Sequence, residues 1–447
     1  MFKAAWLVIR AVGNIAAFIG SLISRSVSLR MRRIRHQLFS SSSPKNFEQK
    51  QCNIVVLGAS MAGYHAAKTI AESILPNSPY HVVVIEPHDH FHFTWVLPRF
   101  SVVEGHEDKA FIPYGPYLRQ VPDGVLRWIQ ARALRITKNS VLLSGGEEIP
   151  YAFLVVATGA GATDTLPSRV NADDKTEGVA KLRDIQIRIK VARNLVVVGG
   201  GAAGVELATD AKSRYPEKTV VLVHSRDNVM HRFGPKLQNA AMDGLRDLGV
   251  EVITGDRLMG EDKERGVVML RSGREIQCDF LVNCAGQKPN STLIAELSPA
   301  SLTATGHVLA KATMQIDDDS LPNIYLCGDV AETSTPNPNS RTARVQATVA
   351  ADNIILAMDG YKPTYKYKPQ WLEGLIKLTL GLDKSTTHIG DFNGTELLFP
   401  AREKDVALMA GGAWKHMGAT PFQDDTETLK RFLSPIQAGA SPSSKVS

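Results

Sequence analysis

Residues 52–86 read CNIVVLGASMAGYHAAKTIAESILPNSPYHVVVIE and decide the fold of this chain. Two apolar runs, IVVL and HVVVIE, flank a turn with a glycine at each end, Gly58 and Gly63. The pattern predicts a strand, a tight turn, a helix and a second strand, which is the unit that binds a dinucleotide. The helix would aim its unpaired N–H groups at a pyrophosphate, and Glu86 would accept a hydrogen bond from a ribose hydroxyl. Ser60 stands where the usual pattern has its second glycine, so an ordinary strand–helix turn is the alternative.

Length and charge limit the class of protein. With 447 residues, the chain is long enough for about three domains. The net charge is +6, but eight of the 51 Lys and Arg lie in the first 47 residues, which hold no Asp or Glu. The rest of the chain, with 43 basic and 45 acidic residues, is near neutral. Because a protein that binds nucleic acid spreads its cationic excess over the folded surface, no nucleic acid partner is expected.

Cysteine and histidine spacing gives no sign of a metal. Four cysteines stand at positions 52, 278, 284 and 327, with neither a CxxC nor a CxxxxC pair. This spacing argues against a disulfide scaffold and against a zinc site. His88, His90 and His92 alternate in a stretch that predicts an irregular loop, which gives no fixed ligand geometry. We expect no metal.

Residues 1–49 are a separate arm. Only 14 residues separate Arg10 from Arg25, whereas a helix needs about 20 to span a bilayer core. An amphipathic, Arg-rich and Ser-rich segment without acids is typical of a mitochondrial presequence, which predicts a mitochondrial location. Two alternatives stay open: a helix that lies on an anionic membrane surface, including a cytoplasmic one, and a secretory signal or anchor. The polar residues at helical spacing are Lys3, Arg10, Asn14, Ser21, Arg25, Ser28 and Arg32.

A second glycine turn follows the apolar run NLVVV. Gly199, Gly201 and Gly204 satisfy the G-x-G-x-x-G pattern in full. The next apolar run, TVVLV, ends in His224 and, two residues on, Arg226, where an NAD-binding unit usually carries an acidic residue. Arg226 suits a 2′-phosphate, so we expect NADPH to be accepted; a solvated loop cation is the alternative.

A return segment, SLPNIYLCGDV, predicts a strand that ends in Gly328 and Asp329. The glycine would allow close approach, and the carboxylate would accept from a ribityl hydroxyl. Two further runs, LVVATGA around Gly159 and CDFLVNCAG, repeat one form and predict an equivalent crossover for each nucleotide unit. Two such units with a return segment are much stronger evidence for dinucleotide binding than one glycine turn.

These features together resemble the two-dinucleotide-domain flavoprotein reductases of the pyridine nucleotide-disulfide oxidoreductase superfamily. Within it the chain is similar to the apoptosis-inducing-factor-like branch, and most closely to the ferroptosis-suppressor-type NAD(P)H:quinone oxidoreductases. The likeness covers about residues 53–418 and includes DHFHFTWVLPRFSVVEG, GGGAAGVE, CAGQKPNS, IYLCGDVAE and AWKHM. It implies an α/β fold with two Rossmann-like domains, as in glutathione reductase, and a small C-terminal α+β domain. The expected parts are an arm (1–49), an FAD-binding domain (50–163 and 288–360), an inserted NAD(P)H-binding domain (164–287), a C-terminal domain (361–420) and a flexible tail (421–447).

The resemblance implies FAD as cofactor and NADH or NADPH as co-substrate. The stretch ETSTPNPNS lacks the lysine often present in this branch, so contacts at the distal flavin face are expected to differ. The residues expected to bind FAD are Gly58, Ser60, Gly63, Glu86, Arg99, Ala131, Gly159, Gly328 and Asp329. Those expected to bind NAD(P)H are Gly199, Gly201, Gly204, His224 and Arg226.

The flavin would take a hydride from a nicotinamide held against it. Glu206 would orient the nicotinamide or supply a proton, the alternative being a carboxylate favoured by the helix dipole. Because no CxxxxC pair exists, the thiol route is excluded and a quinone is the expected acceptor. Trp414 would stack on it and Lys415 would lie near its reduced oxygen, unless residues 361–420 form a dimerising or core-covering sheet.

A second hypothesis is a slowly turning redox-sensing flavoprotein that acts through a protein partner. A reductase for a ferredoxin-like protein is disfavoured, because it would need a basic docking face that the near-neutral body does not indicate. Contact of the arm with a membrane surface and a homodimer both stay open.

Overall fold

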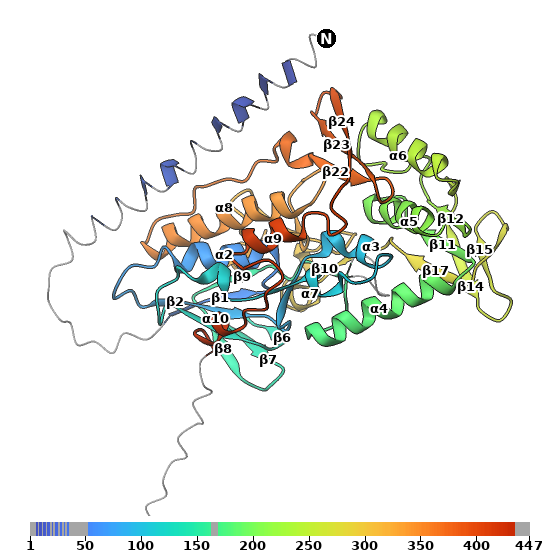
Figure 1. Cartoon of the computed structure of the whole chain (residues 1–447). Coiled ribbons are helices and arrows are strands. Elements are labelled where there is room, and N and C mark those ends of the chain that lie inside the picture. Colours follow the sequence, from blue (N-terminus) through green and yellow to red (C-terminus); the bar gives the residue numbers. More distant parts are fainter. Residues whose placement is uncertain are drawn as a thin grey trace, which may run out of the picture.

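The computed structural model describes residues 52–161 and 169–433, together with scattered positions between 6 and 34 (Figure 1). Two parallel sheets with covering helices lie side by side, and a smaller antiparallel sheet follows them in the chain. The expected α/β fold with two Rossmann-like domains and a C-terminal domain is confirmed.

The first sheet has five parallel strands. Its apolar runs are buried on both faces, as is usual for a parallel sheet covered by helices. The strand order is β20 (Ile324–Leu326), β9 (Phe153–Val156), β1 (Cys52–Leu57), β2 (Tyr80–Ile85) and β5 (Leu126–Ile129). The central strand β1 is therefore the one that leads into the first glycine turn.

Two helices pack on each other beside this sheet. Helix α2 (Met61–Ala71) starts in the glycine turn, and α8 (Ser340–Met358) comes from the far end of the chain (Figure 1). Helix α8 starts at Asn339, whose side chain accepts from the backbone N–H groups of Arg341 and Thr342 in a capping box. The first nucleotide domain is thus closed by a late segment.

The second sheet repeats the plan with four parallel strands. Their order is β13 (Glu251–Ile253), β12 (Thr219–Val223), β11 (Asn194–Val198) and β17 (Phe280–Asn283). Helices α5 (Ala202–Arg214) and α6 (Pro235–Asp247) cover it, and α4 (Lys175–Val191) leads in from the first domain.

The two expected crossovers meet each other. Strand β10 (Ala160–Gly161) pairs antiparallel with β18 (Lys288–Pro289). Around them the Thr158 hydroxyl donates to the Asn290 carbonyl at 2.7 Å, and the Asn290 side-chain amide donates to the Thr158 carbonyl at 2.9 Å. The ends of the two crossover segments therefore pair with each other between the two nucleotide domains.

The C-terminal domain is an antiparallel sheet of β22 (Ile376–Thr379), β23 (Lys384–Gly390) and β24 (Glu396–Arg402). It lies next to α5 and α6 of the inserted domain (Figure 1). Helix α9 (Ala410–His416) follows and packs against the first domain through Trp414.

Residues beyond 420, expected to form a tail, continue on the body as far as 433. Phe432 is buried, and its carbonyl accepts from the Trp128 N–H at 2.9 Å beside β5. Asp424 accepts from His90 at 2.8 Å, which gives one of the alternating histidines a structural partner. The rest of the expected tail, 434–447, lies outside the described residues.

The remaining elements connect these layers. They are β3 (His90–His92), η1 (Thr94–Val96), α3 (Leu97–Phe100), η2 (Glu107–Ala110), β4 (Phe111–Pro113), η3 (Pro116–Leu118), β6 (Ala133–Ile136), β7 (Ser140–Leu143), β8 (Glu148–Pro150), β14 (Leu258–Asp262), β15 (Val267–Leu270), β16 (Glu275–Gln277), α7 (Thr292–Leu297), η4 (Pro299–Ser301), β19 (Val308–Leu309), β21 (Ala331–Glu332), η5 (Trp371–Gly374) and α10 (Glu427–Lys430). Among the helices that the structure describes, none combines the length and apolar character needed to cross a bilayer.

Candidate functional site

The carboxyl edge of the first sheet gathers most residues expected to bind FAD. Parallel strands all end at the same edge, which is where open α/β sheets bind their ligands. Gly58 follows β1, Glu86 follows β2, Ala131 lies two residues beyond β5, Gly159 lies three residues beyond β9, and Gly328 lies two residues beyond β20. The topology therefore brings together five positions that are spread over 270 residues of sequence.

The first glycine turn is packed against its own helix. Gly58 has φ +87°, and a Cβ on Gly63 would lie 1.8 Å from the Gly58 carbonyl oxygen. Only glycine at position 63 lets α2 start this close to β1. Ser60 caps α2 in an extended conformation and is exposed, with no side-chain hydrogen bond to the helix. Its hydroxyl is thus available to a pyrophosphate at the helix N-terminus, and this cradle fits the phosphates of FAD.

Glu86 closes the edge of the cradle. One carboxylate oxygen accepts from the Ala59 N–H at 2.5 Å, and the other accepts from the His88 N–H at 3.0 Å and from the His88 ring. A carboxylate has about four acceptor positions, so a ribose hydroxyl can still bind it. Glu86 therefore both shapes the glycine turn and fits its expected role.

Gly328 and Asp329 lie on the other side of the cradle. Gly328 has φ +78° and donates its N–H to the Gln346 side-chain oxygen of α8 at 2.9 Å. Asp329 pairs with Arg169 at 3.3 Å, a partner that the sequence did not predict. A carboxylate in one such contact keeps acceptor capacity for a ribityl hydroxyl.

The second glycine turn has the same geometry as the first. A Cβ on Gly204 would lie 1.8 Å from the Gly199 carbonyl oxygen, as in the first turn. A Cβ on Gly201 would meet nothing within 4 Å, so the chain leaves space there. The inserted domain thus offers a second dinucleotide cradle, at the N-terminus of α5.

The side chain of His224 makes a hydrogen bond to the second glycine turn. Its Nδ1 accepts from the Gly200 N–H at 3.0 Å, and its Nε2 is buried with no partner among the described residues. Burial, followed by the charges of His231 and Arg226, lowers the pKa of His224, so the ring is neutral and its proton sits on Nε2. His224 is therefore placed to donate, not to accept, beside the ribose position of this cradle. Arg226 is exposed two residues further on.

Glu206 lies on α5 at the junction of three domains. Its carboxyl oxygen accepts from the Thr379 N–H of β22 at 3.1 Å. Burial raises the pKa of Glu206 to about 8, with a further contribution from Asp210 one turn along the helix. At neutral pH the buried side chain is therefore largely protonated and can act as a hydrogen-bond or proton donor.

Arg99 does not lie at the sheet edge. It is on α3, its guanidinium pairs with Asp210 at 2.7 Å, and it donates to the Gly381 carbonyl at 3.0 Å. The geometry favours a role in joining the domains, and contact with FAD stays a prediction. Asp210 was not predicted, although its i, i+4 spacing from Glu206 places both carboxyls on one helix face.

Three of the four thiols are unsuited to electron transfer. No disulfide joins cysteines within the described part of the chain, and burial raises the pKa of Cys278 and of Cys327 to about 12. Burial also raises the pKa of Cys284. A redox cysteine needs a lowered pKa, so these three are packing residues.

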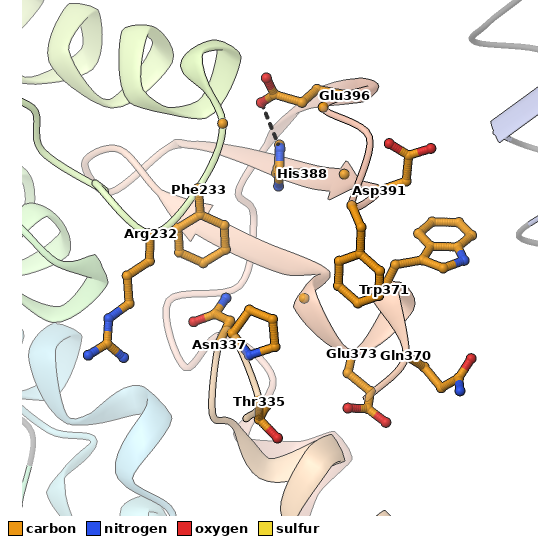
Figure 2. Close-up of a pocket in the computed structure, with 16 residues that line it drawn as sticks. Arg232, Phe233, Thr335, Asn337, Gln370, Trp371, Glu373, His388, Asp391 and Glu396 are labelled. Carbon is orange, nitrogen blue, oxygen red and sulfur yellow. Dashed lines mark hydrogen bonds and ion pairs between the residues drawn. The ribbon is translucent and has the colours of Figure 1, made fainter. Parts of the chain in front are cut away.

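A cavity of about 140 Å³ lies where the inserted domain, the loop before α8 and the C-terminal sheet meet (Figure 2). The rings of Phe233, Trp371 and His388 line it, together with Glu373 and Asn337. His388 donates to or accepts from Glu396 at 2.9 Å through Nε2, and its Nδ1 is buried without a partner among the described residues.

A chain of hydrogen bonds links the cavity wall to the FAD cradle. Thr335 lines it, and the Gln346 side chain donates to the Thr335 hydroxyl at 3.4 Å and to the Thr333 hydroxyl at 3.0 Å. The same Gln346 accepts from the Gly328 N–H. One side chain therefore bridges the cavity wall and the residue expected next to the flavin.

Trp414 and Lys415 do not line this cavity. Trp414 is buried, and its indole donates to the Lys109 carbonyl at 2.9 Å. It therefore covers the core, which was the alternative to stacking on a quinone. Lys415 is exposed on α9, and its expected role near an acceptor stays a prediction.

Comparison with known proteins decides the family. The family model described as pyridine nucleotide-disulphide oxidoreductase matches residues 52–357, which span both cradles and the return strand. The chain belongs to this family. It is an FAD-dependent NAD(P)H oxidoreductase without the cysteine pair that gives the family its name.

Known proteins are similar in sequence to this chain over most of its length. The chain is 36% identical to Fe-regulated protein 8 of Mycosarcoma maydis over 77% of its own length and 89% of that protein. It is 27% identical to Ferroptosis suppressor protein 1 of Homo sapiens, over 85% and 99% respectively. The solved sulfide:quinone oxidoreductase of Aquifex aeolicus has the same fold, with a TM-score of 0.65, 16% identity and coverage of 86% and 95%. The expected resemblance is confirmed.

Proposed function

We propose that this chain is an NAD(P)H:quinone oxidoreductase and that the cavity of Figure 2 receives the quinone ring. The observation that carries the proposal is the bridge by Gln346 between the cavity wall and Gly328 of the FAD cradle. An acceptor in the cavity would lie one hydrogen-bonded side chain away from the cofactor site. A cavity of about 150 Å³ is known to hold a benzene-sized ring, which matches the size found.

The lining suits a planar ring with two polar oxygens. Phe233 and His388 meet edge to face, with ring centroids 5.7 Å apart, and Trp371 faces them across the cavity (Figure 2). Aromatic walls favour a flat apolar ligand, and a few convergent polar groups fix its orientation.

The reaction needs one proton besides the hydride. NAD(P)H, one proton and a quinone give NAD(P)⁺ and a quinol, and FAD, when bound, carries the two electrons from one to the other. His388 can exchange that proton through Nδ1, because Nε2 is held by Glu396 and Nδ1 is the nitrogen left for a ligand. Glu206, protonated at the contact between α5 and β22, would orient the nicotinamide through its carboxyl group.

The test is anaerobic stopped-flow spectroscopy of the full chain. The enzyme is reduced with NADH or NADPH and then mixed with a short-chain ubiquinone analogue, oxygen or a disulfide. We expect fast reoxidation by the quinone alone. Slow reoxidation by all three acceptors, with a long-lived charge-transfer band, would instead support the redox-sensing flavoprotein.

A variant locates the acceptor site. His388→Asn removes the proton-exchanging nitrogen and should slow reoxidation by quinone roughly 10²-fold or more, while reduction by NAD(P)H keeps its rate. His307→Asn, in a half-buried histidine outside the cavity, is the matched control. Equal rates of reoxidation by quinone in both variants would show that the acceptor does not bind in this cavity.

A further inference from the structure

Two arginines of the arm pair with the body, and Leu7 of the arm is buried. The described residues of the arm between Trp6 and Ile34 are helical and lie on the outside of the molecule on the side of α8 (Figure 1). Arg10 pairs with Asp391 at 3.0 Å, and Arg25 pairs with Asp352 of α8 at 2.8 Å. Two ion pairs 15 residues apart along the arm therefore hold it on the folded domains.

One of these pairs lies at the proposed acceptor cavity. Asp391 lines the cavity, and its side chain is 5% exposed. The Arg10 guanidinium also lies 5.6 Å from the ring centroid of Trp371, another lining residue. Arg10 therefore fixes the arm beside the cavity. Phe392, which also lines the cavity, is 64% exposed.

Seven large apolar side chains of the arm face outward. They form an apolar stripe on the solvent side, with side chains 48–62% exposed, whereas Leu7 is buried. An amphipathic helix that docks on a protein core would bury these residues instead. The residues of the stripe are Trp6, Ile9, Val12, Ile23, Val27, Met31 and Ile34.

Charge indicates what covers this stripe. The first 47 residues hold eight Lys and Arg and no acid, and five of the arginines lie between positions 25 and 35. An outward apolar face beside a cluster of arginines fits the boundary of an anionic lipid surface, where apolar side chains enter the acyl region and cations meet the headgroups.

We propose that the arm is a retained membrane-docking element, clamped to the body by Arg10–Asp391 and Arg25–Asp352, with its apolar stripe inserted in an anionic lipid surface beside the cavity. The exposed Phe392 then extends the apolar surface toward the cavity. This proposal stands on the contacts of the arm and is independent of the acceptor.

Vesicle co-sedimentation of the flavin-loaded full chain tests it. We expect the protein to sediment with phosphatidylcholine vesicles that contain phosphatidylserine, and much less with phosphatidylcholine alone. The stripe variant Ile9→Ser, Val12→Ser, Ile23→Ser should bind roughly tenfold or more weakly. Its matched control is Ile187→Ser, Val191→Ser on α4, where the side chains are 59% and 71% exposed. Flavin absorbance confirms that both variants are folded.

Three results would overturn the proposal. The first is equal vesicle binding by the native and stripe-variant proteins. The second is a dimer, seen by light scattering without lipid, that the stripe variant loses while neither protein binds vesicles, which would assign the stripe to a second copy. The third is a mature protein from its own cells that begins after Ile34 by mass spectrometry, as a cleaved presequence requires.

Discussion

Arg99 and Asp210 form an ion pair of 2.7 Å in which the side chains are 1% and 0% exposed. Arg99 belongs to α3 of the FAD domain and Asp210 to α5 of the NAD(P)H domain. The guanidinium also donates to the Gly381 carbonyl in the turn between β22 and β23. One side chain therefore joins all three domains at the point where Glu206 lies one helical turn away.

Removal of Arg99 should destabilise the domain junction. Arg99→Leu leaves the Asp210 carboxylate buried and unpaired, which costs about 3–5 kcal/mol of unfolding free energy. The double variant Arg99→Leu, Asp210→Leu should recover much of this loss, because no charge stays buried. Denaturant midpoints measure both, and Lys190→Ala, in an exposed pair with Glu104, is the control with an expected change below about 1 kcal/mol. A single variant as stable as the native protein would contradict this account.

Substitutions in the two glycine turns should impair the binding of NAD(P)H and of FAD separately. Gly204→Ala pushes a Cβ into the Gly199 carbonyl, so we expect kcat/KM for NADH and NADPH to fall roughly 100-fold or more with FAD retained. Gly63→Ala does the same in the first turn and should yield protein without flavin. Gly412→Ala, where a Cβ meets nothing within 4 Å, is the control. Loss of flavin in the Gly204 variant would show that the cradles are not independent.

Glu206 should impose an alkaline limit on the rate. Because burial raises its pKa to about 8, a step that needs the protonated carboxyl slows as pH rises through that value. Glu206→Gln keeps a donor but cannot ionise, so this limb of the pH–rate profile of flavin reduction should disappear. A profile with the same limb in the variant would assign the titration to another group.

The same carboxyl should affect stability. Its folded pKa lies above the ordinary 4.5, so the folded state retains a proton that the unfolded state has released between pH 4.5 and about 8. The free energy of unfolding should therefore decrease as pH rises across this window. The Glu206→Gln variant should lack this decrease when unfolding is followed at several pH values.

Nucleotide choice should depend on Arg226. Loss of a charged hydrogen bond to a 2′-phosphate is worth about 1.5–3 kcal/mol, so Arg226→Ala should raise KM for NADPH roughly 10- to 100-fold and leave KM for NADH nearly unchanged. Arg246→Ala, at an exposed cation of the same domain near the end of α6, is the control. An equal rise in KM for NADPH and NADH would indicate that Arg226 is a solvated loop cation.

Local patterns in the sequence were enough to predict the two dinucleotide-binding units. Apolar runs followed by Gly58–Gly63 and Gly199–Gly204 predict strand, turn and helix from neighbouring residues alone, because the Cβ-free positions are needed within one turn of chain. Their repetition, with the return strand at Gly328, was enough to predict the fold class. The absence of a CxxxxC pair likewise excludes the thiol route from the spacing of the cysteines alone.

Only the tertiary structure decided which side chains meet across domains. Arg99 finds Asp210 across 111 residues of sequence, and Arg10 finds Asp391 across 381. Nothing local distinguishes these arginines from other cations, because the partner and the burial that strengthens the pair come from packing of distant elements. The arm shows this most clearly: the sequence determined that it is amphipathic, but which face it turns to the body depends on carboxylates that lie more than 320 residues away in the chain.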